Sequence, residues 1–308
     1  MKFDKAYCLS LADKLSIYDV RELNFDETLA FNSTHEHFLC PDDACRAAFP
    51  QSNVLGTFNA RNVNYVRTPH FKNLPATLHR EGCPYGQRKN SAAEEENREE
   101  HFPSELLLTR RQYSLPPTPA NPPAALPPPP RPAEPQERSP APDKTSVFAH
   151  PVECFVSNIG DKDLLKRMPL KIGEQTATYW TFFKKVEYLQ DNKGLIYWGR
   201  IKEIKDYTSS FRIDFEKKVW ADKKPHSVNI YLSKRLIEGY RKRKAFLEEI
   251  KYAIDSQREL YCFFYGVTPQ LKQVPSKKNP QQTFAVFSAD IDNLDHLIIR
   301  EVPGLERS

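Results

Sequence analysis

The chain has 308 residues, of which 39% are hydrophobic and 26 are prolines, and its formal net charge is +5. This length suggests two domains. No run approaches the roughly 18 apolar residues of a membrane-spanning helix, and charges interrupt the short apolar run at the N-terminus. We therefore expect a cytoplasmic protein without a signal peptide or membrane segment. Six cysteines in such a protein indicate reduced thiols or metal ligands rather than disulfides.

Four potential metal ligands lie in the first 88 residues, at spacings typical of zinc sites. Cys40 and Cys45 enclose a turn that contains proline and aspartate, and His79 and Cys83 enclose a turn that contains glycine. Three thiolates and one imidazole form a closed tetrahedral site with no position for a catalytic water. The sequence therefore predicts a structural Zn²⁺ ion, which would help a small domain to fold.

Two alternatives remain open for these residues. His70, which precedes Phe71, competes with His79 as the histidine ligand. In the second alternative, Cys40 and Cys45 are free thiols and His79 is a surface residue.

The same segment resembles a known family. Residues 6–85 are similar to the N-terminal region of CoiA-like competence proteins, and the resemblance rests on a short meander followed by Cys40-Pro41, Cys45, His70-Phe71, His79 and Cys83. Two features depart from the family pattern: four residues rather than two separate the first cysteines, and Asn73 stands where a second histidine is usual. The resemblance implies a DNA-related role, of a kind found in bacteria and mobile elements.

Residues 89–145 are predicted to be a disordered linker. Residues 91–100 are acidic, and thirteen prolines lie between Pro116 and Pro142. Such a composition favours an extended, semi-rigid polyproline II spacer. Alternatively, residues 127–131 form a docking site for the aromatic groove of a protein partner. The apolar patch at residues 106–108 is predicted to be a short helix or a partner-binding segment.

The C-terminal half is basic, with a net charge of +7 over residues 146–308 and −2 over the rest. Apolar runs typical of strands occur at residues 195–205, 211–217, 228–232, 260–267 and 284–291. A segment with helical periodicity, residues 240–254, separates the third run from the fourth. This order resembles an OB-fold, a five-stranded Greek-key barrel that commonly binds oligonucleotides. Gly199 falls where a strongly bent first strand needs a residue without Cβ.

Basic and aromatic side chains alternate along these runs and the loops between them. Single-stranded nucleic acid is bound by this combination, because cations contact phosphates while rings stack on bases. The candidate binding residues are Tyr197, Trp198, Arg200, Lys202, Tyr207, Arg212, Trp220, Tyr231, Lys234, Arg241, Lys242, Arg243, Lys272, Lys277 and Lys278. The alternative for the aromatic residues is the barrel core, and the alternative for residues 241–243 is a solvated helix end. The last three lysines fall in a predicted loop at residues 270–282.

Catalytic motifs are weak. The chain has no P-loop, no dinucleotide fingerprint and no nucleophile elbow. The best carboxylate set, Asp206 with Asp214 and Glu216, is similar to the metal-binding pattern of PD-(D/E)xK-like nucleases. Asp214 and Glu216 also fit the polar face of an alternating strand, which needs no catalytic explanation.

Together these patterns predict an α+β, mostly β protein with three parts: a zinc-binding domain at residues 1–88, the Pro-rich linker at 89–145, and an OB-like nucleic-acid-binding domain at 146–308. The expected function is non-catalytic binding of nucleic acid, with single-stranded DNA as the expected ligand, in support of DNA processing or of mobile-element or phage-related biology. The alternatives are a protein–protein adaptor that uses the barrel and the linker, and a metal-dependent nuclease.

Overall fold

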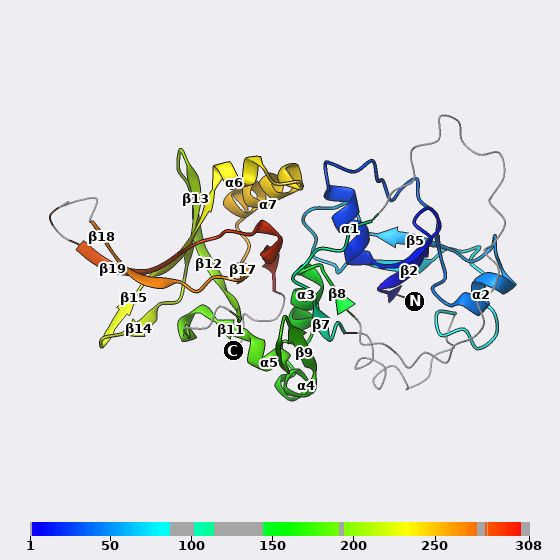
Figure 1. Cartoon of the computed structure of the whole chain (residues 1–308), viewed down its shortest axis with the longest axis horizontal. Coiled ribbons are helices and arrows are strands. Elements are labelled where there is room, and N and C mark those ends of the chain that lie inside the picture. Colours follow the sequence, from blue (N-terminus) through cyan, green and yellow to red (C-terminus); the bar gives the residue numbers. More distant parts are fainter. Residues whose placement is uncertain are drawn as a thin grey trace. The chain divides into compact units, whose positions relative to one another are not determined.

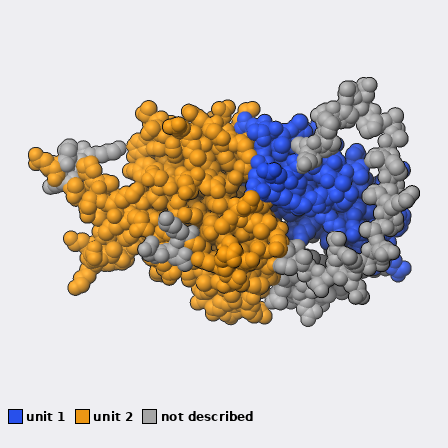
Figure 2. Space-filling model, viewed as in Figure 1, with its two compact units in different colours: residues 1–101, 110–142 blue, residues 102–109, 143–308 orange. Residues whose placement is uncertain are grey.

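The computed structural model describes residues 2–86, 102–113, 144–190, 194–275, 281 and 283–302. The fold is mixed α/β and rich in strands. The chain divides into two compact units (Figure 2): unit 1 comprises residues 1–101 and 110–142, and unit 2 comprises residues 102–109 and 143–308. The predictions at residues 127–131 and at Lys277 and Lys278 fall outside the described residues.

None of the described helices has both the length and the apolar character that crossing a membrane requires.

Unit 1 is built on a six-stranded antiparallel sheet with the order β1-β6-β5-β4-β2-β3. Figure 1 labels β2 and β5 of this sheet. Its strands are β1 (Lys2–Phe3), β2 (Lys5–Cys8), β3 (Asp13–Ser16), β4 (Phe38–Leu39), β5 (Val54–Phe58) and β6 (His70–Asn73). Two helices accompany the sheet, α1 (Ile17–Phe25) and α2 (Asp43–Ala48).

Local sequence explains where α1 begins and how unit 1 is held together. Ser16 caps the helix, because its hydroxyl accepts from the Asp19 N–H while the Asp19 carboxylate accepts from the Ser16 N–H. The helix buries Ile17 and Leu23, and the rings of Phe38 and Phe71 pack 5.2 Å apart in the sheet. Unit 1 therefore has an apolar core in addition to its cysteine cluster.

Unit 2 begins with a four-stranded sheet of order β10-β9-β7-β8 and three helices. The elements are β7 (Glu105–Leu106), β8 (Lys144–Thr145), α3 (Ala149–Ser157), α4 (Lys162–Arg167), β9 (Pro169–Ile172), β10 (Gln175–Thr178) and α5 (Tyr179–Phe182). Leu106 is 1% exposed. The apolar patch at residues 106–108 thus contributes a buried strand residue to unit 2 and forms no helix, while Leu107 and Leu108 are 37% and 43% exposed.

The second sheet of unit 2 has eight strands. Its order is β18-β19-β16-β13-β12-β17-β20, and β11 pairs in parallel with β12. The strands are β11 (Phe183–Lys185), β12 (Ile196–Asp206), β13 (Ser210–Phe215), β16 (Val228–Ser233), β17 (Leu260–Tyr265), β18 (Gln270–Pro275), β19 (Thr283–Asp290) and β20 (Leu297–Glu301). The 3-10 turns η3 (Val186–Tyr188) and η4 (Leu294–His296) and the helices α6 (Lys234–Glu238) and α7 (Arg243–Asp255) complete the unit.

The long strand β12 takes part in both halves of this sheet. Residues 196–200 pair with β17, and the pairing with β13 begins at Ile201 and continues across a bulge to Asp206. Gly199 lies just before this change of partner. A Cβ atom there would lie 2.6 Å from Cγ2 of Val186 and 3.0 Å from a ring carbon of Phe215, so only glycine fits without displacing buried side chains.

The predicted five-stranded barrel is not closed, and this corrects the sequence-based fold. Closure needs one last strand that pairs with both the third and the fourth strands. The chain supplies two strands instead: β19 pairs in parallel with β16, and β20 pairs antiparallel with β17. The η4 turn separates them, so the path of hydrogen-bonded strands stays open between β19 and β20.

Two hairpins that were not predicted extend from this sheet on the side away from α7 (Figure 1). One joins β14 (Val219–Ala221) to β15 (Lys224–His226). The other joins β18 to β19. The predicted loop at residues 270–282 is therefore wrong in its first half, because residues 270–275 form a strand that pairs with β19 along its whole length.

Candidate metal centre and candidate nucleic-acid interface

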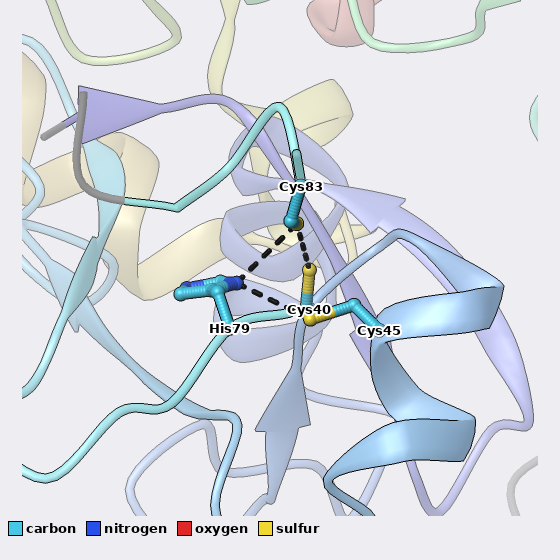
Figure 3. Close-up of side chains that lie close together, drawn as sticks. All are labelled: Cys40, Cys45, His79 and Cys83. Atoms are coloured by element: carbon cyan, nitrogen blue, oxygen red, sulfur yellow. Dashed lines mark hydrogen bonds between the residues drawn. The ribbon is translucent and has the colours of Figure 1, made fainter. Parts of the chain in front are cut away.

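Three segments of unit 1 bring the predicted metal ligands together (Figure 3). Cys40 directly follows β4, Cys45 lies on α2, and His79 and Cys83 lie on the chain after β6. Asp42 caps α2, because its carboxylate accepts from the Cys45 N–H at 2.6 Å. Gly82 has a φ angle of +73°, which is the left-handed conformation that glycine adopts most readily, and this turn leads directly into Cys83.

The spacing of the four ligand atoms fits a tetrahedral ion. The Sγ atoms of Cys40 and Cys83 lie 3.6 Å apart, and Nδ1 of His79 lies 3.5 Å from Cys45 Sγ and 3.4 Å from Cys83 Sγ. Around zinc, with Zn–S near ~2.3 Å and Zn–N near ~2.0 Å, neighbouring ligands lie about 3.5–3.8 Å apart. All four ligand atoms lie within 4.8 Å of one another, so the cluster has the size of a single-ion site.

Burial shifts the pKa of three of these ligands, Cys40, Cys45 and His79. Cys40 and Cys45 are fully buried, and burial raises the pKa of both thiols. Burial also lowers the pKa of His79, which keeps its ring neutral. A neutral imidazole with a free lone pair is ready to bind a metal, whereas the thiols must lose their protons when an ion binds.

A second layer of polar groups orients the cluster. The Oδ1 atom of Asn73 lies 3.1 Å from Nε2 of His79, and the Asn73 amide donates to the Tyr85 carbonyl. The Arg80 N–H points at Cys45 Sγ at 3.5 Å, and the Arg46 guanidinium donates to the Cys40 carbonyl at 2.8 Å. Such neighbours fix the orientation of metal ligands.

His79, not His70, joins the cysteines. The Nδ1 atom of His70 lies 2.9 Å from the Thr68 carbonyl, and its ring packs 4.8 Å from that of Phe58. Sequence spacing left these two histidines open as alternatives, and the structure places only His79 in the cluster.

Two predicted nucleic-acid-binding residues are buried, which corrects their assignment. Tyr197 is fully buried and Trp198 is 5% exposed. The Trp198 ring stacks on Phe263 at 5.8 Å and meets the edge of Phe155, a residue of α3, at 5.6 Å. Residues that precede the predicted barrel therefore cover the first half of β12, so these two rings belong to the core and cannot stack on bases.

Most predicted phosphate-binding cations have a carboxylate partner within unit 2. The ion pairs are Arg200 with Glu216 and Glu259, Arg212 with Asp214, Lys234 with Asp206, Arg241 and Lys242 with Asp295, and Lys272 with Asp290. Lys202 and Arg243 are exposed. Asp295 thus pairs with the first two of the four cations before and at the start of α7, and the sequence did not indicate this partner.

One polar group of predicted residues does come together on the outward face of β13 and β16. Arg212 lies directly opposite Tyr231, and its guanidinium carbon lies 5.6 Å from the Tyr207 ring centroid. Asn229, on the same face, is 6% exposed, and its Oδ1 atom has no hydrogen-bond partner in the described part of the chain. The same holds for Nε of Arg212.

Trp220 is the predicted aromatic residue that the structure leaves most open, at 72% exposure. It lies on β14, next to the exposed Lys217 and Lys218 and across the hairpin from Pro225. The sequence analysis missed two neighbours, the exposed Lys223 and Lys224. A two-residue turn between short alternating runs was the available signal, but it lacks the Asn-Gly or Asp-Gly pair that makes such turns recognisable.

The carboxylates of the nuclease alternative do not form a metal site in the described residues. Asp206 pairs with Lys234 at 2.6 Å, Asp214 with Arg212 at 2.9 Å, and Glu216 with Arg200 at 3.1 Å. Within the described ranges, the cysteine–histidine cluster is the group whose ligand atoms lie close enough to hold an ion.

Comparisons with protein-family models, with curated proteins and with solved structures give no match for this chain, so its resemblances to CoiA-like proteins and to OB-folds remain predictions.

Proposed function

We propose that this protein binds single-stranded nucleic acid without catalysis, through the eight-stranded sheet of unit 2. A Zn²⁺ ion held by Cys40, Cys45, His79 and Cys83 stabilises unit 1. Single-stranded DNA is the proposed ligand, and support of DNA processing is the proposed role.

The pairing of the strands supports an OB-like domain. In an OB-fold, the first strand pairs with the second and fourth, and the third pairs with the fifth; the barrel is commonly part-open, and the face of strands two and three binds oligonucleotides. Here β12 pairs with β13 and β17, β13 pairs with β16, and β16 pairs with β19. By this correspondence, β13 and β16 carry the binding face.

The observation that carries the proposal is the unsatisfied polar chemistry on that face. A buried polar atom without a hydrogen bond is costly, so each one needs an explanation. Two such atoms, Oδ1 of Asn229 and Nε of Arg212, belong to adjacent strands beside the rings of Tyr207 and Tyr231. A guanidinium, an amide and two tyrosine rings are the kinds of group that single-strand recognition uses. Arg212 and Tyr231 are half-buried and can meet a ligand, whereas Asn229 lies buried beneath that face.

The donor set supports zinc as the metal. Three soft thiolates and one imidazole are a ligand set that suits zinc, and a site with four protein ligands has no open position for substrate. The role that we assign to the ion is therefore structural.

Fluorescence anisotropy of the full chain with labelled oligo-dT and with a matched duplex tests the binding function. The proposal predicts that the single strand binds more tightly at low salt, and that Arg212→Ala weakens this binding. Arg258→Ala is the matched control, because Arg258 is an exposed, ion-paired arginine on another part of unit 2. Absence of binding to either probe at low salt would overturn the proposal and favour the protein–protein adaptor.

A further inference from the structure

The β14–β15 hairpin presents a tryptophan on an otherwise basic surface. Trp220 is 72% exposed and pairs across the hairpin with the exposed Pro225. The hairpin extends from unit 2 on the side away from α7 (Figure 1). A tryptophan so exposed loses the benefit of burial, so a ligand that covers it would restore that benefit.

The lysines around this ring differ from the ion-paired arginines of the sheet, Arg200 and Arg212. Four lysines near the ring are exposed and have no carboxylate partner among the described residues: Lys217, Lys218, Lys223 and Lys224. By contrast, the arginines of the sheet and the first two cations before α7 are ion-paired. Residues 217–224 thus carry four lysines against one carboxylate, the exposed Asp222, and this positive balance favours an anionic ligand.

The turn of the hairpin has residues with side chains where the backbone conformation favours glycine. Asp222 and Lys223 have φ angles of 49° and 62°, a left-handed conformation that favours glycine. A lysine at this position carries charge to the tip of the hairpin, where glycine would form the turn more easily.

The hairpin is also anchored at its base. Val219 is 7% exposed, and the ring of His226 lies 3.2 Å from the Ala221 carbonyl and 3.3 Å from the Ala285 carbonyl of β19. Phe284, which is 51% exposed, directly precedes Ala285. The exposed ring of Trp220 is therefore held on a supported element, with a second exposed ring next to the anchor point.

From these observations we infer that the β14–β15 hairpin is a second contact site for the same single strand, separate from the face of β13 and β16. Trp220 stacks on an unpaired base, and the four lysines contact the phosphates on either side of that base. Stacking of this kind requires a free base, so the hairpin selects single strands over duplex. This inference rests on the proposed function.

The test compares hairpin variants of the full chain on labelled oligo-dT at low salt. Trp220→Ala is expected to weaken binding about tenfold, as the loss of one base–aromatic stack does, and Lys223→Ala with Lys224→Ala to weaken it and to reduce its salt dependence. The matched controls are Trp180→Ala, at a 39% exposed tryptophan outside the hairpin, and the pair Lys166→Ala and Lys251→Ala, which removes two exposed lysines from α4 and α7. These controls are expected to bind as the unmodified chain does.

A fluorescence measurement distinguishes loss of the stacking contact from misfolding of a variant. Oligo-dT is expected to quench the tryptophan emission of the unmodified chain, and Trp220→Phe is expected to abolish most of this quenching while preserving most of the affinity. Unchanged affinity and unchanged quenching in the Trp220 variants would overturn the hairpin site while leaving the proposed function intact. If the unmodified chain binds no oligonucleotide, the proposed function fails and the hairpin site fails with it.

Discussion

The Oδ1 atom of Asn73 lies 3.1 Å from Nε2 of His79, while Nδ1 of the same ring lies 3.4 Å from Sγ of Cys83. The Asn73 amide nitrogen donates to the Tyr85 carbonyl, which can only accept, so the amide oxygen faces the histidine. His79 therefore carries its proton on Nε2 and presents the Nδ1 lone pair to the cysteines. Asn73 thus orients the candidate histidine ligand.

This arrangement predicts the effect of changing Asn73. Asn73→Ala removes the acceptor that orients the ring, so zinc affinity should fall by about 10- to 100-fold. Asn73→Asp keeps an acceptor and should retain most of the affinity. Competition with a chromophoric chelator measures both values. His70→Ala is the control, and a loss of zinc in this variant would contradict the assignment of His79.

Removal of the ion should destabilise unit 1. The purified full chain is expected to contain one equivalent of zinc by elemental analysis, and Cys45→Ala to contain much less. Because the ion links α2, the end of β4 and the loop after β6, its loss should lower the thermal stability of unit 1. Cys154→Ala, at a thiol of unit 2, should retain the metal. A chain that folds and melts identically with and without chelator would refute a structural ion.

Gly199→Ala should destabilise unit 2. The added Cβ would lie 2.6 Å from Val186 and 3.0 Å from Phe215, both of which are buried, and overpacking of this kind costs about 1–3 kcal/mol. Urea denaturation measures the difference. Gly160→Ala is a matched control, because no atom lies within 4 Å of a Cβ at that position. Equal stabilities of the two variants would show that β12 tolerates a side chain at its bend.

Lys223→Gly should change the stability of the chain and its affinity for oligonucleotide in opposite directions. Glycine relieves a left-handed residue, whose cost is about 1 kcal/mol, so the melting temperature should not fall and is expected to rise. Affinity for oligo-dT should nevertheless decrease, because a charge is lost at the tip of the hairpin. Lys224→Gly lies on the strand and should lose both stability and affinity. If Lys223→Gly binds as tightly as the unmodified chain, this lysine does not contact the ligand.

Asp295 makes the stability of unit 2 fall as the solution becomes acidic. Burial alone would raise the pKa of this carboxyl, but Lys242, Arg241 and the Tyr240 hydroxyl outweigh burial and lower it to about 2. An unfolded aspartate titrates near ~3.9. The resulting stabilisation, about 2 kcal/mol, is fully present above this value and is lost as the pH falls towards the folded pKa.

Asp295→Asn tests this linkage. The variant should be less stable than the unmodified chain at neutral pH, and the difference between the two should shrink between about pH 4 and pH 2, since the remaining carboxylates titrate equally in both. Denaturant titrations at several pH values measure the difference. A difference that does not change with pH would exclude Asp295 as its source.

The sequence correctly predicted the strands that bury one face and leave the other more exposed. Phe211, Ile213 and Phe215 alternate with polar residues, and the structure buries all three on β13. The helix at residues 240–254 is confirmed as α7 at nearly the same bounds. Trp198 was predicted to lie on the surface because an alternating pattern cannot show that further elements pack on the outer face of a strand. Residues of α3 and β11 cover that part of β12, so both faces are buried.

The metal ligands were predictable from spacing, whereas their surroundings were not. The pairs Cys40–Cys45 and His79–Cys83 each enclose a local turn. Residues this close in the sequence are therefore also close in space. The choice between His70 and His79 depends on how residues 74–83 return towards α2, which is a tertiary property. Asn73 acts through a hydrogen bond across six residues, and no local pattern indicates such a role.

The salt dependence of oligonucleotide binding tests the central claim of this account most directly. Anisotropy titrations of the full chain with labelled oligo-dT at increasing salt concentrations should give a linear fall of log K with log salt, with a slope near −0.7 for each phosphate neutralised, or about −3 if the four hairpin lysines dominate. A steep slope with weaker binding of duplex is the predicted result. Binding that is independent of salt, or that is no tighter for the single strand than for duplex, would contradict the claim that unit 2 recognises single-stranded nucleic acid.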